Sequence, residues 1–247
     1  MKELKAIGFD LFNTLITMEA PALKEALERL VRSLKKSGFV VEEEGFKASH
    51  REAAERYLEE CKQDGKETHN RYWISSALGD HGYEVKPDDP RISDAVEAYF
   101  TAFYDYSRLI PGTREMLGKV SSTYRVGMLT NFTHGPAARR IIGQLGLEPL
   151  FDVIIISGEI GFRKPNPLVF KKLCGRLGVL ETQIMHVGDD PEADVLGALH
   201  AGIQPVWVVH GNGAPLPAPF PQETALSVAD VPTISSWQEL LAILEKS

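Results

Sequence analysis

The sequence predicts an α/β fold, in which a Rossmann-like, doubly wound parallel sheet carries an inserted α-helical cap. Two observations support this prediction. Short apolar runs alternate with helical patterns through the second half of the chain, and a long helix-rich segment separates the first apolar run from the second. Strands that alternate with helices pair in parallel and are covered by helices on both faces. The strand-like runs are residues 6–9, 126–129, 153–156, 184–187 and 206–209.

Each of these runs is short and apolar on both faces, as expected of strands that are buried between two helical layers. Helical periodicity follows the second, third and fourth runs, at residues 134–145, 167–177 and 192–201. A last helix is expected at 237–244, where Ser236 and Glu239 are placed to form a capping box. The stretch 211–221 is rich in Pro and Gly and is predicted to be a surface loop.

The segment between the first two runs is mostly helical in pattern and too long to be a loop. Apolar residues recur in it at helical spacing, for example Leu23, Leu27, Leu30, Val31 and Leu34. We therefore predict that residues 19–106 form an inserted helical cap over the C-terminal edge of the sheet. Residues 1–18 and 107–247 are then expected to form the core.

Composition limits the classes of function. With 247 residues, 43% of them hydrophobic and 25% charged, the chain is typical of a soluble globular protein with one large domain or two unequal ones. The net charge of −7 argues against a nucleic-acid partner, which requires a basic surface. An anionic small-molecule substrate stays compatible with this charge, because a metal ion and one lysine can reverse the local sign.

Two cysteines, Cys61 and Cys174, are too few for a disulfide framework and suit a reducing compartment. The first apolar run begins near the N-terminus, so we expect no signal peptide, and no apolar run approaches the length of a membrane span. The expected location is therefore cytoplasmic, without a membrane partner. The sequence leaves a monomer and a homodimer open.

Polar residues stand where these strands end, and the C-terminal ends of parallel strands are where α/β sheets bind ligands. Asp10 follows the first run within Gly-Phe-Asp-Leu-Phe-Asn-Thr-Leu. Thr130 and Asn131 follow the second run, and Lys164 lies beyond the third in Gly-Phe-Arg-Lys-Pro-Asn-Pro. The fourth run is followed by Gly-Asp-Asp-Pro-Glu-Ala-Asp, which includes two further candidates, Asp189 and Asp194.

These four segments, in this order, resemble the motifs of the haloacid dehalogenase-like hydrolase superfamily. The resemblance implies that Asp10 is a nucleophile that is transiently esterified by the substrate. Thr130 and Asn131 would contact an oxygen of the substrate. Lys164 would hold the anionic substrate and offset repulsion among the carboxylates.

The same resemblance implies a Mg²⁺ site, which suits oxygen ligands. Asp10 and Asp189 would share the ion, and the main-chain carbonyl of Phe12 would be a further ligand. Asp194 would lie behind them and order water or Lys164. Because a carbonyl ligand does not depend on the side chain, Phe12 is compatible with metal binding.

Phe12 departs from the commonest members, the phosphatases, which have a second Asp at this place. That Asp protonates the leaving group and then activates water, a contribution of roughly 10²–10⁴ in rate. Haloacid dehalogenases proper also lack it, but they use no metal and have a small polar residue where this chain has Asp189. The sequence therefore combines a dehalogenase-like first motif with a metal-type fourth motif.

Three functions fit this mixture. We favour Mg²⁺-dependent hydrolysis of a small phosphorylated metabolite, with an acid from elsewhere or a leaving group that needs none. The alternatives are a metal-free 2-haloacid dehalogenase and a weakly active or non-catalytic ligand-binding protein. The residues considered as a substitute acid are Glu19, His50, Lys66, His69 and His134. His134 is more typical of a helix start, and His186 of a satisfied core residue.

Overall fold

The computed structural model describes residues 3–209 and 231–246. Within these ranges, six parallel strands form one sheet in the order β5-β4-β1-β6-β7-β8. The chain starts in the middle of the sheet and adds later strands on both sides, so the sheet is doubly wound and the predicted α/β class is confirmed. The strands are β1 (Ala6–Phe9), β4 (Arg125–Thr130), β5 (Val153–Ile156), β6 (Ile184–Gly188), β7 (Gln204–Val208) and β8 (Thr233–Ile234).

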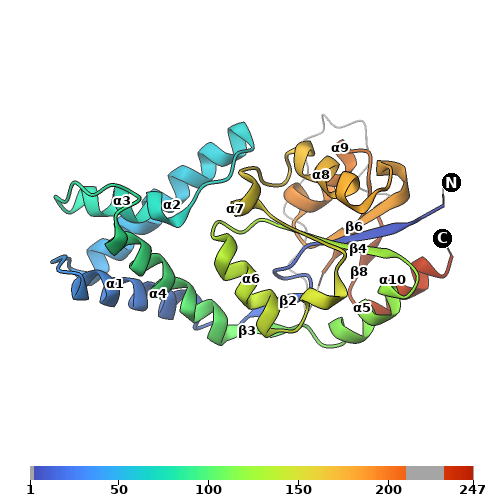
Figure 1. Ribbon diagram of the computed structural model, residues 1–247, viewed down its shortest axis with the longest axis horizontal. Helices are drawn as coiled ribbons and strands as arrows, with labels where there is room; N and C mark the ends of the chain where they lie inside the picture. The colour runs from blue at the N-terminus through green and yellow to red at the C-terminus, as the bar shows by residue number, and fades with distance from the viewer. Residues whose placement is uncertain (1–2, 210–230, 247) are drawn as a thin grey trace.

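Helices cover both faces of this sheet (Figure 1). Because successive side chains of a strand point to opposite faces, β1 contributes to two cores. Ile7 and Phe9 pack in the core that includes residues of α5, α6 and α10, whereas Ala6 packs in the core that includes residues of α8 and α9. The helices around the sheet are α5 (Thr113–Ser121), α6 (Gly135–Gln144), α7 (Ser157–Ile160), α8 (Pro167–Leu177), α9 (Gly197–His200) and α10 (Trp237–Leu244).

Helix α8 shows how local sequence sets the ends of an element. The side chain of Asn166 accepts a hydrogen bond from the backbone N–H of Leu168, and Pro167 occupies the first turn. The helix ends at Gly178, whose φ of +66° is the left-handed conformation that glycine adopts without strain. The predicted bounds 167–177 are confirmed.

Two helix predictions need correction. Residues 192–201 were expected to form one helix, but η3 (Pro191–Leu196) is a π-helix and α9 follows it. Ser236 makes no side-chain capping bond at the start of α10. The carboxylate of Glu239 instead accepts from the backbone N–H of Ser235, one residue earlier than the predicted box.

The shortest elements were missed, because two or three residues are too few to show an alternating pattern. β2 (Ile16–Met18) and β3 (Ser107–Leu109) form an antiparallel pair, with Ile16 opposite Leu109. The strand β8 and the helices α5 and α7 were also not predicted. Two 3₁₀ turns complete the described core, η1 (Glu148–Leu150) and η2 (Glu181–Gln183).

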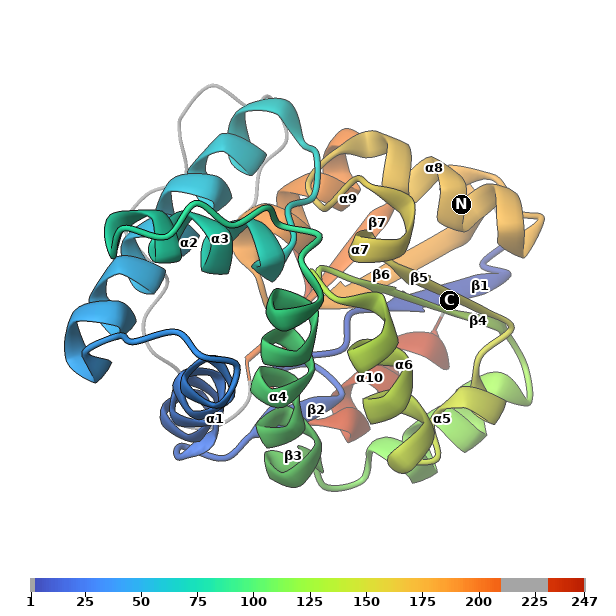
Figure 2. The same cartoon turned by 60° about the vertical axis from the view of Figure 1, so that its left-hand side comes forward.

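The residues between β2 and β3 form four helices, here called the α1–α4 segment. It lies beside the sheet in both views of the ribbon (Figures 1 and 2). Its apolar side chains share one continuous core with a face of the sheet, so that Phe100 of the segment and Phe132 of the loop after β4 are in contact. The helices are α1 (Ala22–Lys36), α2 (Glu43–Asp64), α3 (Asn70–Asp80) and α4 (Pro90–Tyr106).

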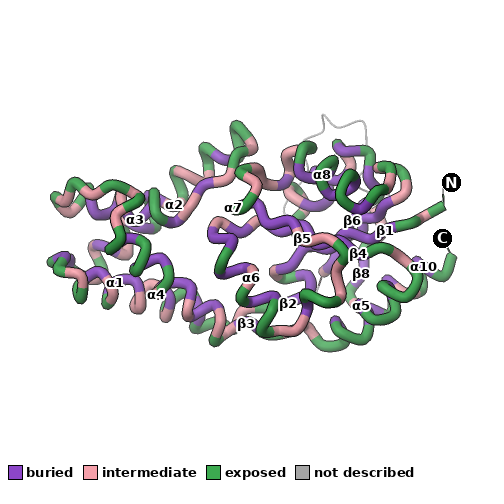
Figure 3. Tube along the Cα trace, in the orientation of Figure 1, coloured by how far each residue is buried: buried purple, intermediate pink, exposed green. Residues whose placement is uncertain are grey.

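Burial follows this arrangement, with the strands of the sheet mostly buried and the outer faces of the helices exposed (Figure 3). Cys61 and Cys174 are buried free thiols. In the part of the chain that the structure describes, no helix is both long and apolar enough to cross a membrane. The predicted loop 211–221 lies outside the described residues.

Candidate active site

All the predicted site residues line one cavity at the C-terminal ends of β1, β4 and β6. Asp10 directly follows β1, Thr130 ends β4, and Asp189 directly follows β6. Because β4 and β6 both pair with β1, these three strand ends are neighbours in space. The cavity is lined by Asp10, Phe12, Asn13, Thr130, Asn131, Arg163, Lys164, Asp189, Asp190, Ala193 and Asp194.

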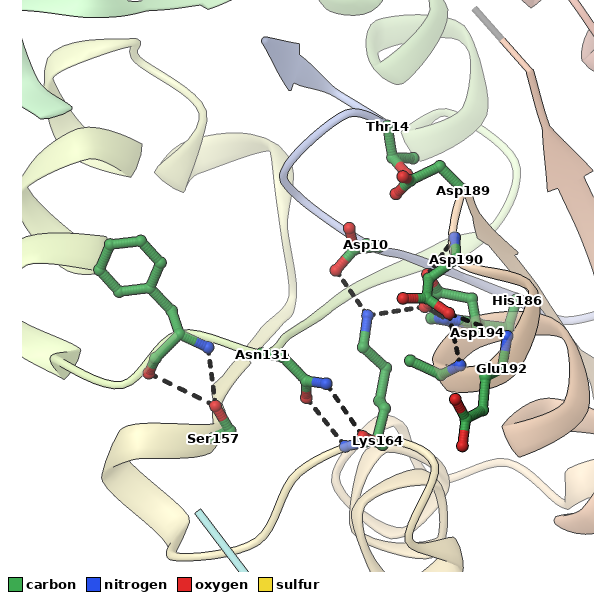
Figure 4. A network of polar contacts seen from close by, with 12 residues as sticks. Asp10, Thr14, Asn131, Ser157, Lys164, His186, Asp189, Asp190, Glu192 and Asp194 are labelled. Atoms are coloured by element: carbon green, nitrogen blue, oxygen red, sulfur yellow. Dashed lines mark hydrogen bonds and ion pairs between the residues drawn. The ribbon is translucent and has the colours of Figure 1, made fainter. Parts of the chain in front are cut away.

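The side chain of Lys164 connects two of these carboxylates (Figure 4). Its Nζ atom lies 2.5 Å from Oδ1 of Asp10 and 2.6 Å from Oδ1 of Asp194, and the residue is only 3% exposed. A buried ammonium between two carboxylates makes strong charge-assisted hydrogen bonds. Lys164 therefore fixes the position of Asp10 within the cavity.

Asn131 holds the backbone of Lys164. Its Nδ2 atom donates to the carbonyl of Lys164 over 3.0 Å, and its Oδ1 atom accepts from the N–H of Lys164 over 2.8 Å. This paired contact links the loop after β4 to the loop that carries the lysine. Asn131 was expected to offer its amide to the substrate, and that contact stays a prediction.

Asp194 accepts hydrogen bonds from three donors. Its Oδ1 atom accepts from Lys164 and, over 2.8 Å, from Nε2 of His186, while its Oδ2 atom accepts from the backbone N–H of Asp190 over 3.1 Å. Burial alone would raise the pKa of Asp194, but the charge of Lys164 and the hydrogen bond from His186 lower it to about 2. Asp194 is therefore ionised in the folded protein.

His186 was expected to be a core residue, and its burial confirms this, but its place in this network was not predicted from the sequence. It lies on β6 and is fully buried; its Nε2 atom faces Asp194, and its Nδ1 atom has no hydrogen-bond partner among the described residues. Burial lowers the pKa of His186, which favours the neutral ring with its proton on Nε2. The available sequence signal was a histidine within an apolar strand that leads to the fourth motif.

The pKa of Asp10 is raised to about 7, chiefly by burial and against the charge of Lys164. Lys164 is one cation shared by two buried carboxylates, and its own pKa is raised because those carboxylates outweigh the effect of burial. Asp194 has hydrogen-bond donors besides Lys164, which stabilise its ionised form. The cost of burying a second carboxylate beside one cation therefore appears at Asp10, as a raised pKa. A further cation near Asp10 would relieve it.

Asp189 lies on the other side of Asp10 and accepts at Oδ1 from the hydroxyl of Thr14 over 3.2 Å. Burial, with the charge of Asp194, raises its pKa to about 6. One carboxylate oxygen each from Asp10, Asp189 and Asp194 lie within 4.8 Å of one another. Oxygen donors gathered around a buried excess of negative charge fit Mg²⁺, which prefers such ligands.

Phe12 packs as part of an aromatic stack. Its ring lies against that of Phe132, with the centroids 5.2 Å apart and the planes within 8° of parallel. Phe132 in turn contacts Phe100 and Phe103 of α4, at centroid distances of 5.2 and 5.9 Å. The place of the missing carboxylate is therefore occupied by a ring that is held in position from both the core and the α1–α4 segment.

Comparison with known proteins now identifies the family. The sequence profile of haloacid dehalogenase-like hydrolases matches residues 4–202. This chain belongs to that family. The resemblance inferred from the four motifs is therefore confirmed, and the protein is a hydrolase of the haloacid dehalogenase-like class.

Individual relatives of this hydrolase share about a quarter of its sequence. Glyceraldehyde 3-phosphate phosphatase of Pyrococcus furiosus is 26% identical over all of this chain and 95% of its own length. N-acylneuraminate-9-phosphatase of Rattus norvegicus is 27% identical over 95% of this chain and 94% of its own. The crystal structure of a 2-haloacid dehalogenase from Pseudomonas syringae superposes with a TM-score of 0.72 at 24% identity, covering 98% and 99% of the two chains. That last likeness concerns the fold.

Proposed function

We propose that this hydrolase is a Mg²⁺-dependent phosphatase that acts on a small phosphorylated metabolite through Asp10. The observation that carries the proposal is the placement of Asp10 between the ammonium of Lys164 and the carboxylate of Asp189. This arrangement gives a nucleophile, a fixed positive charge and oxygen ligands for a cation in one cavity. The names of the curated relatives support a phosphatase.

In the proposed reaction, a carboxylate oxygen of Asp10 attacks the phosphorus atom. The bond from phosphorus to the leaving oxygen breaks with its electron pair, and an aspartyl phosphate forms. Water then attacks the phosphorus, releases inorganic phosphate and restores Asp10. Among the described residues, Lys164 is the one side chain that bonds Asp10, and it does so at Oδ1, so Oδ2 has lone pairs free.

The other site residues would bind and orient the phosphoryl group. Thr130, which is buried at the end of β4, would donate its hydroxyl to a phosphoryl oxygen, and Asn131 and Lys164 would contact the substrate beside it. Asp194 would keep Lys164 charged and in place. The proposed ligands of Mg²⁺ are Asp10, Asp189 and the carbonyl of Phe12, and the ion, when bound, would neutralise charge on the carboxylates and the phosphoryl group.

We further propose that residues 19–106 act as a cap on a core of residues 1–18 and 107–247. Support comes from contacts between the loop after α2 and the loop that carries Lys164. The backbone N–H of Glu67 donates to the carbonyl of Gly161, and that of Arg163 donates to the carbonyl of Gly65. Closure of such a cap would exclude water from the cavity.

A substrate panel tests this proposal. Phosphate esters, acyl phosphates and 2-haloacids are each assayed with Mg²⁺ and with a chelator, and the wild type is compared with Asp10→Asn. Asp94→Asn serves as a matched control, since Asp94 is an exposed residue of α4. We expect phosphate release that requires both Asp10 and Mg²⁺. Halide release that survives the chelator would instead establish a dehalogenase, the function that Phe12 would also suit.

A further inference from the structure

The residues around Asp10 bear on how the leaving group departs. A phosphatase of the usual kind protonates the leaving oxygen, so the cavity must supply an acid. Phe12 occupies the position at which the acid was expected from the first motif. Its side chain lines the cavity but cannot donate a proton. An acid would have to come from another lining residue or from elsewhere.

The other acidic groups of the cavity already have hydrogen-bond roles. Asp190 accepts at Oδ1 from the backbone N–H groups of Glu192 and Ala193, which caps η3. Asp194 is ionised and bonded to Lys164 and His186. Asp10 is the proposed nucleophile and Asp189 a proposed metal ligand, which must be deprotonated to bind.

The substitute acids considered from the sequence do not line the cavity. Glu19 is an exposed residue that forms an ion pair with Arg108 at 3.0 Å. His134 is bonded at Nε2 to Glu97 and at Nδ1 to His69, over 2.8 and 3.0 Å, so both of its ring nitrogens face partners in the α1–α4 segment.

The remaining three are also placed elsewhere. His69 accepts at Nδ1 from the backbone N–H of Arg71 over 3.1 Å, and its Nε2 atom faces His134 over 3.0 Å. His50 is buried in the α1–α4 segment beside the rings of Phe46, Trp73 and Tyr99. Lys66 is exposed and pairs with Asp64 at 3.1 Å. Within residues 3–209 and 231–246, the cavity therefore has a proposed nucleophile, a cation and proposed metal ligands, but no carboxyl or imidazole group that is free to act as the acid.

From these contacts we propose that the protein acts on phosphoryl compounds whose leaving group is a stable anion, as in acyl or aryl phosphates, and that phosphorylated Asp10 accumulates during turnover. The inference rests on the proposed phosphatase function and narrows its substrate class. In the first step, the bond from Asp10 to phosphorus forms while the bond to the leaving oxygen breaks. The leaving oxygen keeps the electron pair as a carboxylate or phenolate and needs no proton.

The second step, hydrolysis of the aspartyl phosphate, also lacks general-base catalysis, because Phe12 cannot accept a proton from water. Water attacks the phosphorus of aspartyl phosphate, and its proton must pass to solvent or to the departing phosphate, because none of the described residues lining the cavity is a free base. Phosphorylation by an activated donor is thus faster than hydrolysis of the intermediate. The stacked ring of Phe12 also gives the cavity an apolar surface, which suits a planar acyl or aryl group better than a hydrated alcohol.

The decisive measurement is the dependence of rate on the basicity of the leaving group. Wild-type protein with Mg²⁺ is assayed on aryl phosphates of graded leaving-group pKa, on acetyl phosphate and on glycerol phosphate. We expect kcat/KM to fall steeply with leaving-group pKa, and the alkyl phosphate to be slower than the most activated aryl phosphate by at least about 10²-fold, the lower range of acid catalysis. Rates within tenfold across the series would overturn the inference while leaving the phosphatase function intact.

Two further measurements make the test independent of one substrate series. Rapid-quench experiments with an activated aryl phosphate should show a burst of phenolate and a phosphorylated Asp10 in the acid-quenched protein, absent in Asp10→Asn. Phe12→Asp should raise the rate on glycerol phosphate by about 10²–10⁴-fold and remove the burst, while Asp94→Asn, at the exposed position of α4, behaves as the wild type. A wild type with no burst would contradict the accumulation, and failure to release phosphate from every ester would instead remove the proposed function itself.

Discussion

The ammonium of Lys164 lies 2.5 Å from Oδ1 of Asp10, although 154 positions separate the two residues in the sequence. The contact is buried on both sides, with the side chains of Lys164 and Asp10 2% and 9% exposed. A pair of this kind holds its geometry firmly, because either partner left alone would be a buried charge without compensation. It therefore links the reactivity that we propose for Asp10 to the stability of the core.

Replacement of Lys164 should affect both properties. We expect Lys164→Met to lower the free energy of unfolding by about 3–5 kcal/mol, since it leaves Asp10 and Asp194 without their cation, and to abolish phosphate release. Urea denaturation measures the first effect and a phosphate assay the second. Lys171→Met, at an exposed position of the adjacent helix α8, should change neither. Equal stability of the two variants would show that the buried cation contributes nothing.

Replacement of Asp189 should have a pH-dependent effect on stability. Its pKa is about 6 in the folded protein and about 3.9 in an unfolded chain. A carboxyl group with a raised folded pKa destabilises the fold fully above that pKa, and the effect disappears as pH falls towards the unfolded value. With a chelator present, we expect Asp189→Asn to be more stable than the wild type at about pH 8 by up to about 3 kcal/mol, because the shift is about two pKa units and one unit is about 1.4 kcal/mol.

The same two proteins test the metal site. The difference in stability should shrink as the pH is lowered through about 6, and Mg²⁺ at about pH 8 should raise the melting temperature of the wild type alone, because only the wild type gains binding free energy in the folded state. An equal rise in both proteins would remove Asp189 from the set of ligands.

The hydrogen bond from His186 to Asp194 should increase kcat indirectly, because Asp194 in turn holds Lys164. His186→Leu removes the donor, and a hydrogen bond to a charged group contributes about 1.5–3 kcal/mol, so we expect kcat to fall by about ten- to a hundredfold. KM should change less, because His186 does not line the cavity. His186→Gln, whose amide can donate to Asp194, should recover most of kcat. Equal losses in both variants would point to core packing alone.

The contact between Glu67 and Arg163 should hold the proposed cap against the core. Oε1 of Glu67 lies 3.2 Å from the guanidinium of Arg163, and its side chain is 2% exposed. Glu67→Ala should therefore increase amide hydrogen exchange at residues 65–67 and 161–163 and raise KM more than it lowers kcat. Glu60→Ala, at an exposed position of α2, is the control. Unchanged exchange at these residues would show that the backbone contacts suffice.

The sequence by itself determined the order of the five longer strands, the parallel sheet and the membership of the family. These depend on local patterns: apolar runs, helical spacing, and polar residues at the ends of strands that a parallel sheet brings to one edge. The ends of α8 are likewise set by local residues, with Asn166 as its N-cap and Gly178 as its C-cap. The elements that were not predicted include the two- and three-residue strands, which are too short to carry a pattern, and the helices α5 and α7.

Only the tertiary structure decided how the side chains are partnered. Three contacts join residues that are distant in the sequence or on separate elements. Lys164 bonds both Asp10 and Asp194, His186 donates to Asp194, and the ring of Phe12 stacks on that of Phe132. No local pattern encodes them, because hydrogen-bond partners and burial depend on which elements pack together. The sequence therefore showed that Phe12 stands where an acid was expected beside Asp10, whereas the packing showed that none of the considered residues lines the cavity.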